Sequence, residues 1–353
     1  MNGHLPKGLA TVDEVGGFDA MIDARSPAEY AEDHLPGALS MPVLNNEERA
    51  RVGTLYKQVS AFEAKKLGAV LVSRNIADHV ERHLLDKPKS WRPLVYCWRG
   101  GQRSGAFSHI LREIGFDAHR LQGGYKAWRK HVIERLAHLP AALRFRVVSG
   151  ATGSGKSRLL EALAAQGAQV LHLEALARHK GSVLGSLPGE PQPAQKGFES
   201  ALLSALESFD AARPVYVEAE SRKIGSLQLP EELLLAIRQA PGLRLEAPLA
   251  ASVEFLLGDY DYAIADPRWL TERLGHLRGL QSNETLDGWR KMVEGGEFRR
   301  LVEELLTQHY DPLYERSQTR NYAAFGTADT FATERLDGGA LDRLAARILA
   351  TSA

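Results

Sequence analysis

Short apolar runs alternate with amphipathic stretches along the first 139 residues. Compact apolar runs predict strands, and apolar residues three or four positions apart predict helices. The predicted strands are residues 20–24, 39–43, 94–96 and 118–121, and the predicted helices are residues 104–115 and 125–139. Pro140 interrupts the last helix, so we predict a domain boundary there. The alternation indicates an α/β domain with a mainly parallel sheet.

A second alternating pattern begins after Pro140. Strands are predicted at residues 145–149, 170–173, 215–217 and 243–245, with a helix before Gly167 and another at 198–209. Residues 181–195, rich in Gly, Ser and Pro, predict a long loop. Beyond Pro248 most of the chain is predicted to be helical. We therefore expect two domains, residues 1–139 and 140–353, the second being α/β with a helical C-terminal part.

The composition is that of a folded globular protein. The chain has 353 residues, of which 44% are hydrophobic and 25% charged, which excludes wholesale disorder, collagen-like and coiled-coil structures. No apolar stretch approaches the roughly 18 residues of a membrane span, and the N-terminus has no apolar signal core. We therefore expect a cytoplasmic protein.

Charge is balanced over the whole chain and unbalanced locally. The 44 basic and 44 acidic residues cancel, which argues against a protein held to nucleic acid by its overall field. Residues 87–130 contain ten Lys and Arg but only two acidic residues, Glu113 and Asp117. Such a segment is either a solvated face or a footprint for anions and phosphate backbones, and phosphate contacts predict salt-dependent binding.

Residues 150–157, Gly-Ala-Thr-Gly-Ser-Gly-Lys-Ser, fit the pattern G-x-x-x-x-G-K-[ST] between a predicted strand and a predicted helix. The glycines permit a turn whose backbone N–H groups converge on phosphate oxygens, and the helix N-terminus adds partial positive charge. Lys156 would neutralise the phosphates. The candidate phosphate-binding residues are Gly150, Thr152, Gly153, Ser154, Gly155, Lys156 and Ser157. The motif does not select the ligand, and ATP is the default.

A divalent metal beside these phosphates would need oxygen ligands. The Ser157 hydroxyl is the first candidate for Mg²⁺, and the second is Glu218, which ends the apolar run 215–217. A solvated strand end is the alternative for Glu218. Glu174 ends the preceding strand and is a candidate for orienting a substrate, and Glu220 lies two residues after Glu218.

The single cysteine, Cys97, lies in a glycine-rich loop between a predicted strand and a predicted helix. With one cysteine no intramolecular disulfide can form. Amides of the loop, the helix N-terminus and nearby arginines favour the thiolate, so we predict a nucleophilic sulfur that substrates can reach. The candidate catalytic residues are Cys97, Arg99, Gly100, Gly101 and Arg103. A buried, inert cysteine is the alternative.

Two chemistries are compatible with this loop. A thiolate can accept sulfur or selenium as a persulfide or perselenide, or it can attack a phosphate ester. The spacing from Cys97 to Arg103 is also C-x5-R, in which the arginine binds phosphate through two parallel hydrogen bonds. That phosphatase chemistry needs a carboxylic acid to protonate the leaving group.

Several motifs together resemble known families. Residues 23–30 (Asp-Ala-Arg-Ser-Pro-Ala-Glu-Tyr), 34–38 and 121–128, with the Cys97 loop, resemble a rhodanese domain. Joined to a phosphate-binding loop, the combination is similar to the tRNA 2-selenouridine synthases, as are residues 173–182, 192–196 and 217–225. The resemblance implies a rhodanese-like N-terminal domain with a parallel sheet and a P-loop NTPase-like α/β domain.

The resemblance also implies an activity. A member of this family replaces sulfur by selenium in wobble 2-thiouridine of tRNA, through an S-geranyl intermediate, with geranyl diphosphate and selenophosphate as co-substrates. It implies a selenotransferase and geranyltransferase that acts on the tRNA anticodon loop, without a membrane or a tightly bound cofactor. Cys97 matches the family's catalytic cysteine and residues 150–157 its phosphate loop. Two alternatives are a P-loop kinase or ATPase with a rhodanese-like sulfurtransferase or regulatory domain, and an RNA-binding module with inactive pockets.

Overall fold

The computed structural model describes residues 8–322 and 325–351. The chain folds into two compact units. Unit 1 comprises Met1–Arg135 with Glu199–Ala201, and unit 2 comprises Leu136–Phe198 with Leu202–Ala353. Among the described residues, no helix is long and apolar enough to cross a membrane.

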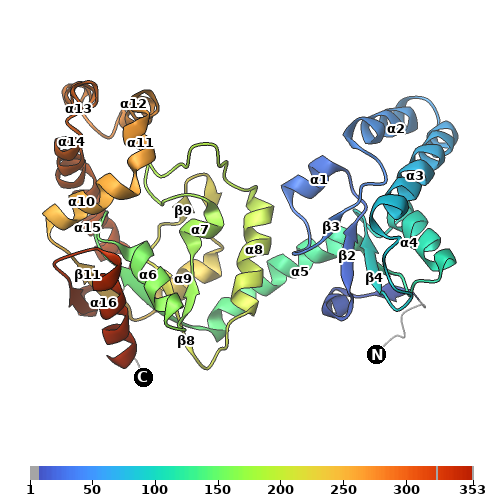
Figure 1. Ribbon diagram of the computed structural model, residues 1–353, viewed down its shortest axis with the longest axis horizontal. Helices are drawn as coiled ribbons and strands as arrows, with labels where there is room; N and C mark the ends of the chain where they lie inside the picture. The colour runs from blue at the N-terminus through green and yellow to red at the C-terminus, as the bar shows by residue number, and fades with distance from the viewer. Residues whose placement is uncertain (1–7, 323–324, 352–353) are drawn as a thin grey trace. The chain divides into compact units, whose positions relative to one another are not determined.

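Unit 1 is built on a five-stranded parallel sheet in the order β1-β5-β4-β2-β3. Figure 1 labels its strands β2, β3 and β4. The strands are β1 (Leu9–Ala10), β2 (Ala20–Asp23), β3 (Leu39–Ser40), β4 (Pro93–Tyr96) and β5 (His119–Leu121). The helices are η1 (Val12–Gly17), α1 (Pro27–Glu32), α2 (Asn46–Gln58), α3 (Ala61–His83), α4 (Gln102–Ile114) and α5 (Gly124–His138). The predicted parallel α/β fold is confirmed for this unit.

Two parts of unit 1 differ from the pattern predicted. The strand expected at 39–43 ends at Ser40, because Pro42 has no N–H to donate to a ladder. Helices α2 and α3 were not predicted at all. Helix α2 buries none of its residues and α3 only Ala64, Leu71 and Ile76, so neither displays a strong apolar stripe.

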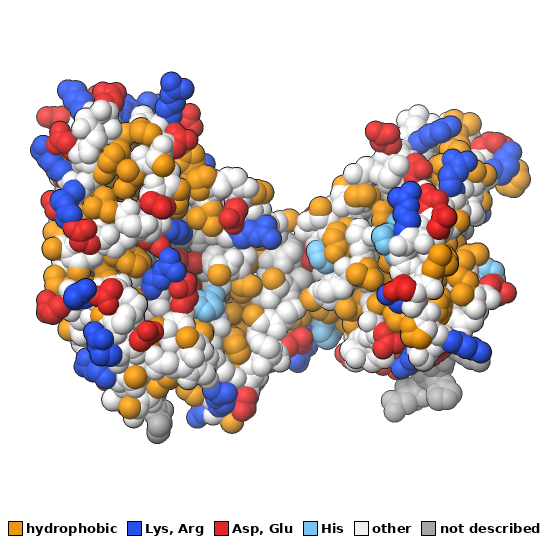
Figure 2. All heavy atoms as spheres, viewed as in Figure 1, with side chains coloured by type: hydrophobic (Ala, Val, Ile, Leu, Met, Phe, Trp, Pro, Cys, Tyr) orange, Lys and Arg blue, Asp and Glu red, His pale blue; other side chains and the backbone are white. Residues whose placement is uncertain are grey.

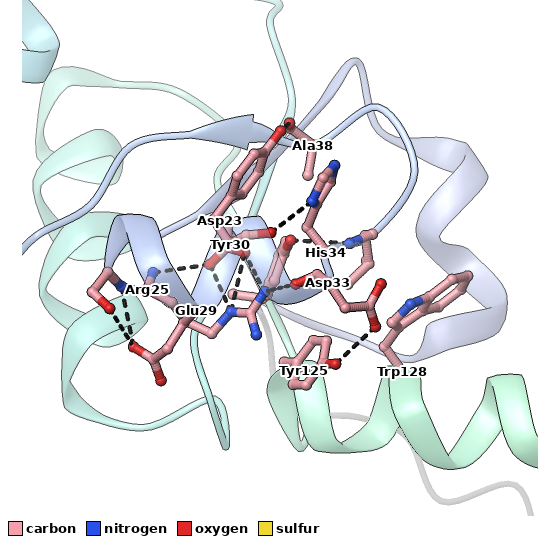
Figure 3. A network of polar contacts seen from close by, with 12 residues as sticks. Asp23, Arg25, Glu29, Tyr30, Asp33, His34, Ala38, Tyr125 and Trp128 are labelled. Carbon is pink, nitrogen blue, oxygen red and sulfur yellow. Dashed lines mark hydrogen bonds and ion pairs between the residues drawn. The ribbon is translucent and has the colours of Figure 1, made fainter. Parts of the chain in front are cut away.

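A buried ion pair lies at the carboxyl end of β2, the strand that pairs with β4 just before Cys97. Arg25 is 1% exposed and donates to Asp23, with Nη2 2.6 Å from Oδ2, and to the Asp33 carbonyl at 2.6 Å. The Arg25 guanidinium lies 3.9 Å from the centre of the Tyr125 ring, whose hydroxyl donates to Asp33 Oδ2 at 2.7 Å (Figure 3). Because a buried charge is costly without partners, this network holds β2, α1 and the start of α5 in one arrangement.

Unit 2 contains a second five-stranded parallel sheet, in the order β12-β11-β6-β8-β7. Its strands are β6 (Arg144–Ser149), β7 (Gln169–Leu171), β8 (Pro214–Glu218), β11 (Gly242–Glu246) and β12 (Asp329–Ala332), and β9 (Lys223–Ile224) with β10 (Leu227–Gln228) forms a separate antiparallel pair. Around the sheet lie η2 (Leu139–Ala142), α6 (Lys156–Ala165), α7 (Leu173–Ala177), α8 (Gln195–Glu207), α9 (Glu231–Gln239) and α16 (Gly338–Thr351). The P-loop follows the central strand β6, as predicted.

The C-terminal part is largely helical, as expected. It contains α10 (Leu249–Asp259), α11 (Asp261–Ala265), α12 (Pro267–Leu274), η3 (Gly275–Leu277), α13 (Asn283–Gly295), α14 (Phe298–Leu305), the π-helical turn η4 (Leu306–Tyr310), α15 (Asp311–Asn321) and η5 (Phe325–Thr327). These helices enclose an apolar cluster of their own around Leu274 and Trp289. The strand β12 was not predicted, because only Phe331 of its four residues is buried.

Candidate functional site

The Cys97 loop joins the buried strand β4 to helix α4. Tyr96 and Cys97 are both buried, and α4 begins at Gln102 after Gly101. The Sγ of Cys97 lies 3.2 Å from the Ser104 hydroxyl, in the first turn of α4. Gly100 adopts a φ of +67°, and a Cβ there would lie 2.7 Å from the Leu121 carbonyl oxygen. Only glycine fits this turn, which curls the loop over the sulfur.

The segment after β5 holds the cysteine loop from the other side. The backbone N–H groups of Tyr125 and Lys126 donate to the carbonyls of Cys97 and Trp98, at 2.8 Å and 3.1 Å. Gly124 permits this approach, since a Cβ on it would lie 2.2 Å from the Cys97 carbonyl oxygen. Tyr125 also packs on Arg25. The buried ion pair and the cysteine loop are therefore linked through one tyrosine.

The loop stabilises the thiolate although the sulfur is buried. Burial raises the pKa of the Cys97 thiol, but hydrogen bonds from the side chain and backbone of Ser104, the charge of Arg103 and the Gly101 amide outweigh it. The net pKa lies below that of an ordinary thiol. A cysteine that merely fills a core would have a raised pKa, so this loop is built for an anion.

The structure corrects one expectation about the sulfur. We expected a thiolate that substrates reach directly, whereas Cys97 is 3% exposed and packs among the core residues of unit 1. The reason is that the curled loop and Ser104 enclose it. Of the other predicted residues, Arg99 is exposed, and Arg103 forms an ion pair with Glu29 at 2.9 Å. A large substrate needs movement of the loop to reach the sulfur.

Five of the ten basic residues in the segment 87–130 form ion pairs, four of them with partners outside the segment. Lys87 pairs with Asp86 and Lys130 with Glu134, just beyond its two ends, while Arg103 pairs with Glu29. Within the segment, Arg92 pairs with Asp117. Figure 2 shows basic and acidic side chains interspersed on the visible face of each unit. The segment therefore fits a solvated face better than its sequence count suggests.

The P-loop of unit 2 has the strand, turn and helix that its motif requires. Strand β6 ends at Ser149 and α6 begins at Lys156. The Lys156 amine donates to the carbonyls of Gly150 and Ala151, at 2.7 Å and 3.1 Å, so it lies over the turn. The Ser154 hydroxyl is buried and, among the described residues, has no hydrogen-bond partner. Glycines and amides at a helix N-terminus form an anion cradle.

A cavity of about 560 Å³ opens beside this turn. It is lined by the loop from Thr152 to Ser157, by Glu174 and Glu220, and by Tyr310 and Tyr314. The Tyr314 hydroxyl accepts a hydrogen bond from the Gly150 N–H at 2.5 Å. Burial lowers the pKa of Lys156 and raises that of Glu220 well above its ordinary value. Three basic side chains and four carboxylates line the cavity, so an anionic ligand would meet both signs of charge; they are Lys156, Arg158 and Lys180, with Glu161, Glu174, Glu220 and Asp259.

The structure brings Ser157 together with Glu174. The Ser157 hydroxyl donates to Glu174 Oε2 at 2.9 Å. The Glu218 carboxylate instead accepts from the N–H groups of Leu173 and Glu174, at 3.2 Å and 3.4 Å, at the start of α7. No group of three or more His, Cys, Asp or Glu suited to a metal occurs among the described residues. Mg²⁺ commonly uses one or two protein oxygens plus phosphates and waters, and Ser157 with Glu174 fits that pattern.

Replacing Glu218 by glutamine is expected to remove a pH dependence of stability. Burial raises the pKa of Glu218 from 4.5 to about 7. Between these pH values the Glu218 side chain holds a proton in the folded chain that it has lost in the unfolded chain. Its contribution to the free energy of unfolding therefore falls as pH rises and is constant above pH 7. At roughly 1.4 kcal/mol per pKa unit, the fall is about 3 kcal/mol. Glutamine keeps an acceptor for the two N–H groups and carries no charge.

Urea denaturation at pH 5 and pH 8, in buffer with EDTA, measures this difference. The exposed variant Glu231→Gln, in the first turn of α9, is the matched control and should keep the slope of the parent chain. If Glu218→Gln loses as much stability as the parent between the two pH values, the assignment of the pH dependence to Glu218 is wrong.

The sequence analysis did not identify three side chains that contact these two loops. Ser104 and Tyr125, which contact the Cys97 loop, and Tyr314, which contacts the P-loop, carry no motif of their own for binding or catalysis. Ser104 lies in the first turn of α4, seven residues after Cys97, and this closeness in sequence is the signal that was available. Tyr314 comes from α15, far along the chain, and no local pattern marks it.

Comparisons with known proteins match two different domain families to the two units. Residues 9–131 match the rhodanese-like domain, and residues 143–282 match the tRNA 2-selenouridine synthase AAA domain. The fold and the two loops thus define a rhodanese-like domain joined to a P-loop-type domain. The tRNA 2-selenouridine synthase of Alcanivorax borkumensis is 34% identical over 85% of this chain and 90% of its own length. The chain belongs to the tRNA 2-selenouridine synthase family.

Two further relatives carry the same name. The protein of Bdellovibrio bacteriovorus is 35% identical over 86% of this chain and 89% of its own length. The protein of Nitrosomonas europaea is 39% identical, over 68% of this chain and 63% of its own length. The similarity therefore extends over both units.

Proposed function

We propose that this chain converts wobble 2-thiouridine in tRNA to 2-selenouridine through an S-geranyl intermediate. The observation that carries the proposal is the presence, in one member of this family, of a thiolate-stabilising loop and a separate phosphate cradle. Family membership supports an enzyme that modifies tRNA with selenium. The two-step route accounts for a P-loop that need not hydrolyse ATP.

In the first step the sulfur of 2-thiouridine attacks C1 of geranyl diphosphate. The C1–O bond breaks and diphosphate leaves, with negative charge growing on the leaving oxygen. The amides of the P-loop and Lys156 are placed to stabilise that charge. Mg²⁺, held by Ser157 and Glu174, would supply further positive charge to the diphosphate.

In the second step selenium adds to C2 of the uracil ring. Geranylation converts a poor leaving group into a thiol, so the C2–S bond breaks and geranyl thiol departs. Selenophosphate supplies the selenium. The Cys97 thiolate, which its loop stabilises, attacks the phosphorus, so that the P–Se bond breaks and selenide leaves to add to C2. Water then hydrolyses the S–P bond and releases phosphate.

Mass spectrometry of wobble nucleosides tests the proposal. Transfer RNA with 2-thiouridine is incubated with the protein and geranyl diphosphate, selenophosphate, both, or ATP. Geranyl diphosphate alone should give S-geranyl-2-thiouridine, and both co-substrates should give 2-selenouridine. ATP turnover that survives loss of Cys97, with no modified nucleoside, would favour a P-loop kinase or ATPase. Binding of tRNA without any product would favour a binding module.

A further inference from the structure

A second, apolar cavity adjoins the P-loop cavity within unit 2. Its volume is about 70 Å³. Residues that line both cavities are Thr152, Ser182, Leu256, Tyr260 and Tyr310. Beyond this shared wall the smaller cavity is lined only by apolar side chains and Trp269, from helices α11, α12 and α14, the turn η4, and Leu184 of the loop before α8. A phosphate cradle and a hydrocarbon-lined space thus share one wall.

The shared wall touches the phosphate-binding turn directly. Thr152 belongs to that turn, and a Cβ on Gly153 would lie 2.7 Å from Leu256 Cδ1. Glycine at this position therefore lets α10 pack against the loop. Leu256 therefore lies beside the turn and lines both cavities.

Two features distinguish the smaller cavity from an ordinary packing defect. The hydroxyl of Tyr310, on the shared wall, is buried beside the Ser182 side chain and the Leu184 backbone. Leu306 and Tyr310 are the first and last residues of the π-helical turn η4, and both line the cavity. Such turns are rare and occur frequently at functional sites. The Tyr310 hydroxyl therefore brings a polar group to the wall that the apolar cavity shares with the P-loop cavity.

We propose that the apolar cavity receives the distal end of the hydrocarbon chain of an isoprenoid diphosphate whose head lies on the P-loop. This inference rests on the proposed function, because it takes the P-loop ligand to be a prenyl diphosphate. The chemistry of the two spaces matches the two ends of such a molecule. The ribose and base of a nucleotide would find few polar partners beyond the shared wall.

The size of the cavity sets how much of the chain enters. A cavity of about 150 Å³ holds benzene, so 70 Å³ takes only the end of a ten-carbon chain. The part nearer the diphosphate lies along Leu256, Tyr260 and Tyr310 in the larger cavity. A five-carbon chain does not reach the small cavity, and a fifteen-carbon chain exceeds it. The site should therefore favour ten carbons.

Affinities of the full chain for dimethylallyl, geranyl and farnesyl diphosphate, measured by calorimetric titration, test this inference. Ala263 is 2% exposed and lines the cavity, so Ala263→Leu should fill it. We expect this variant to bind geranyl diphosphate about tenfold more weakly, because about two methylene groups of the ligand would no longer be buried. Its affinity for dimethylallyl diphosphate should not change. The control is Ala265→Leu, on the same helix but exposed.

A second variant keeps the inference testable if Ala263→Leu does not fold. Leu305→Ala enlarges the cavity. It should raise the affinity for farnesyl diphosphate relative to the affinity for geranyl diphosphate. Inorganic diphosphate binding and thermal melting report whether each variant keeps its P-loop intact. If geranyl diphosphate binds through Lys156 but neither variant changes the preference among chain lengths, the tail pocket is wrong and the proposed function stands. If the parent chain binds no prenyl diphosphate, the proposed function itself fails.

Discussion

Replacing Cys97 by alanine is expected to abolish selenium incorporation while S-geranylation of the same tRNA continues. Cys97 is the chain's single cysteine, so no other thiol can replace it. Its thiolate is stabilised by Ser104, Arg103 and Gly101, and the alanine variant keeps the loop but loses the sulfur. The P-loop lies in the other unit, which is why geranyl transfer should survive. Nucleoside mass spectrometry measures both products in one reaction.

Two serine variants test whether selenium incorporation depends on the pKa of the Cys97 thiol or only on an intact loop. Ser104→Ala removes the hydroxyl 3.2 Å from the Cys97 sulfur, so the pKa of the thiol should rise and selenium incorporation should need a higher pH. Ser108→Ala is the matched control, since Ser108 is equally buried on α4 and donates to the Gly105 carbonyl instead. Its pH profile should be that of the parent. Selenation by Cys97→Ala equal to that of the parent would remove Cys97 from the reaction.

Replacing Lys156 by alanine is expected to lower the rate of geranyl transfer by about a hundredfold, the usual cost of one group that stabilises a developing anion. Its amine lies over the P-loop, within hydrogen-bond distance of Gly150 and Ala151. Affinity for geranyl diphosphate should fall as well. Single-turnover transfer to 2-thiouridine tRNA gives the rate, and calorimetry gives the affinity.

Two comparisons make the Lys156 result specific. Lys223→Ala removes an exposed amine in the same unit and should leave both rate and affinity unchanged. When tRNA that already carries S-geranyl-2-thiouridine is supplied, Lys156→Ala should form 2-selenouridine at the parent rate. Unimpaired geranyl transfer by Lys156→Ala would place the diphosphate at another site.

The sequence predicts those parts of the structure whose determinants are local. The P-loop lies between β6 and α6 because its glycines, lysine and flanking apolar runs are contiguous, and the parallel sheets follow from alternating strands and helices. Cys97 is placed between β4 and α4 for the same reason.

Features that depend on distant residues were not predictable in this way. The Ser157 hydroxyl contacts Glu174 rather than Glu218, because Glu218 is used to accept N–H groups at the start of α7. Tyr314 contacts Gly150 although the two residues are 164 positions apart in the sequence. The burial of Cys97 depends on the packing of residues 123–126 against its loop, which no spacing along the chain reveals.

Because the Cys97 sulfur is buried, a lowered thiol pKa does not make it accessible to reagents. The loop favours the ionised form, yet only 3% of the residue is exposed, so bulky electrophiles and glutathione-sized thiols meet a steric barrier. The thiolate is thereby sheltered from exchange with the surrounding thiol pool and from oxidation, both of which depend on access as well as ionisation. The same barrier means that a nucleoside can reach the sulfur only after the loop opens.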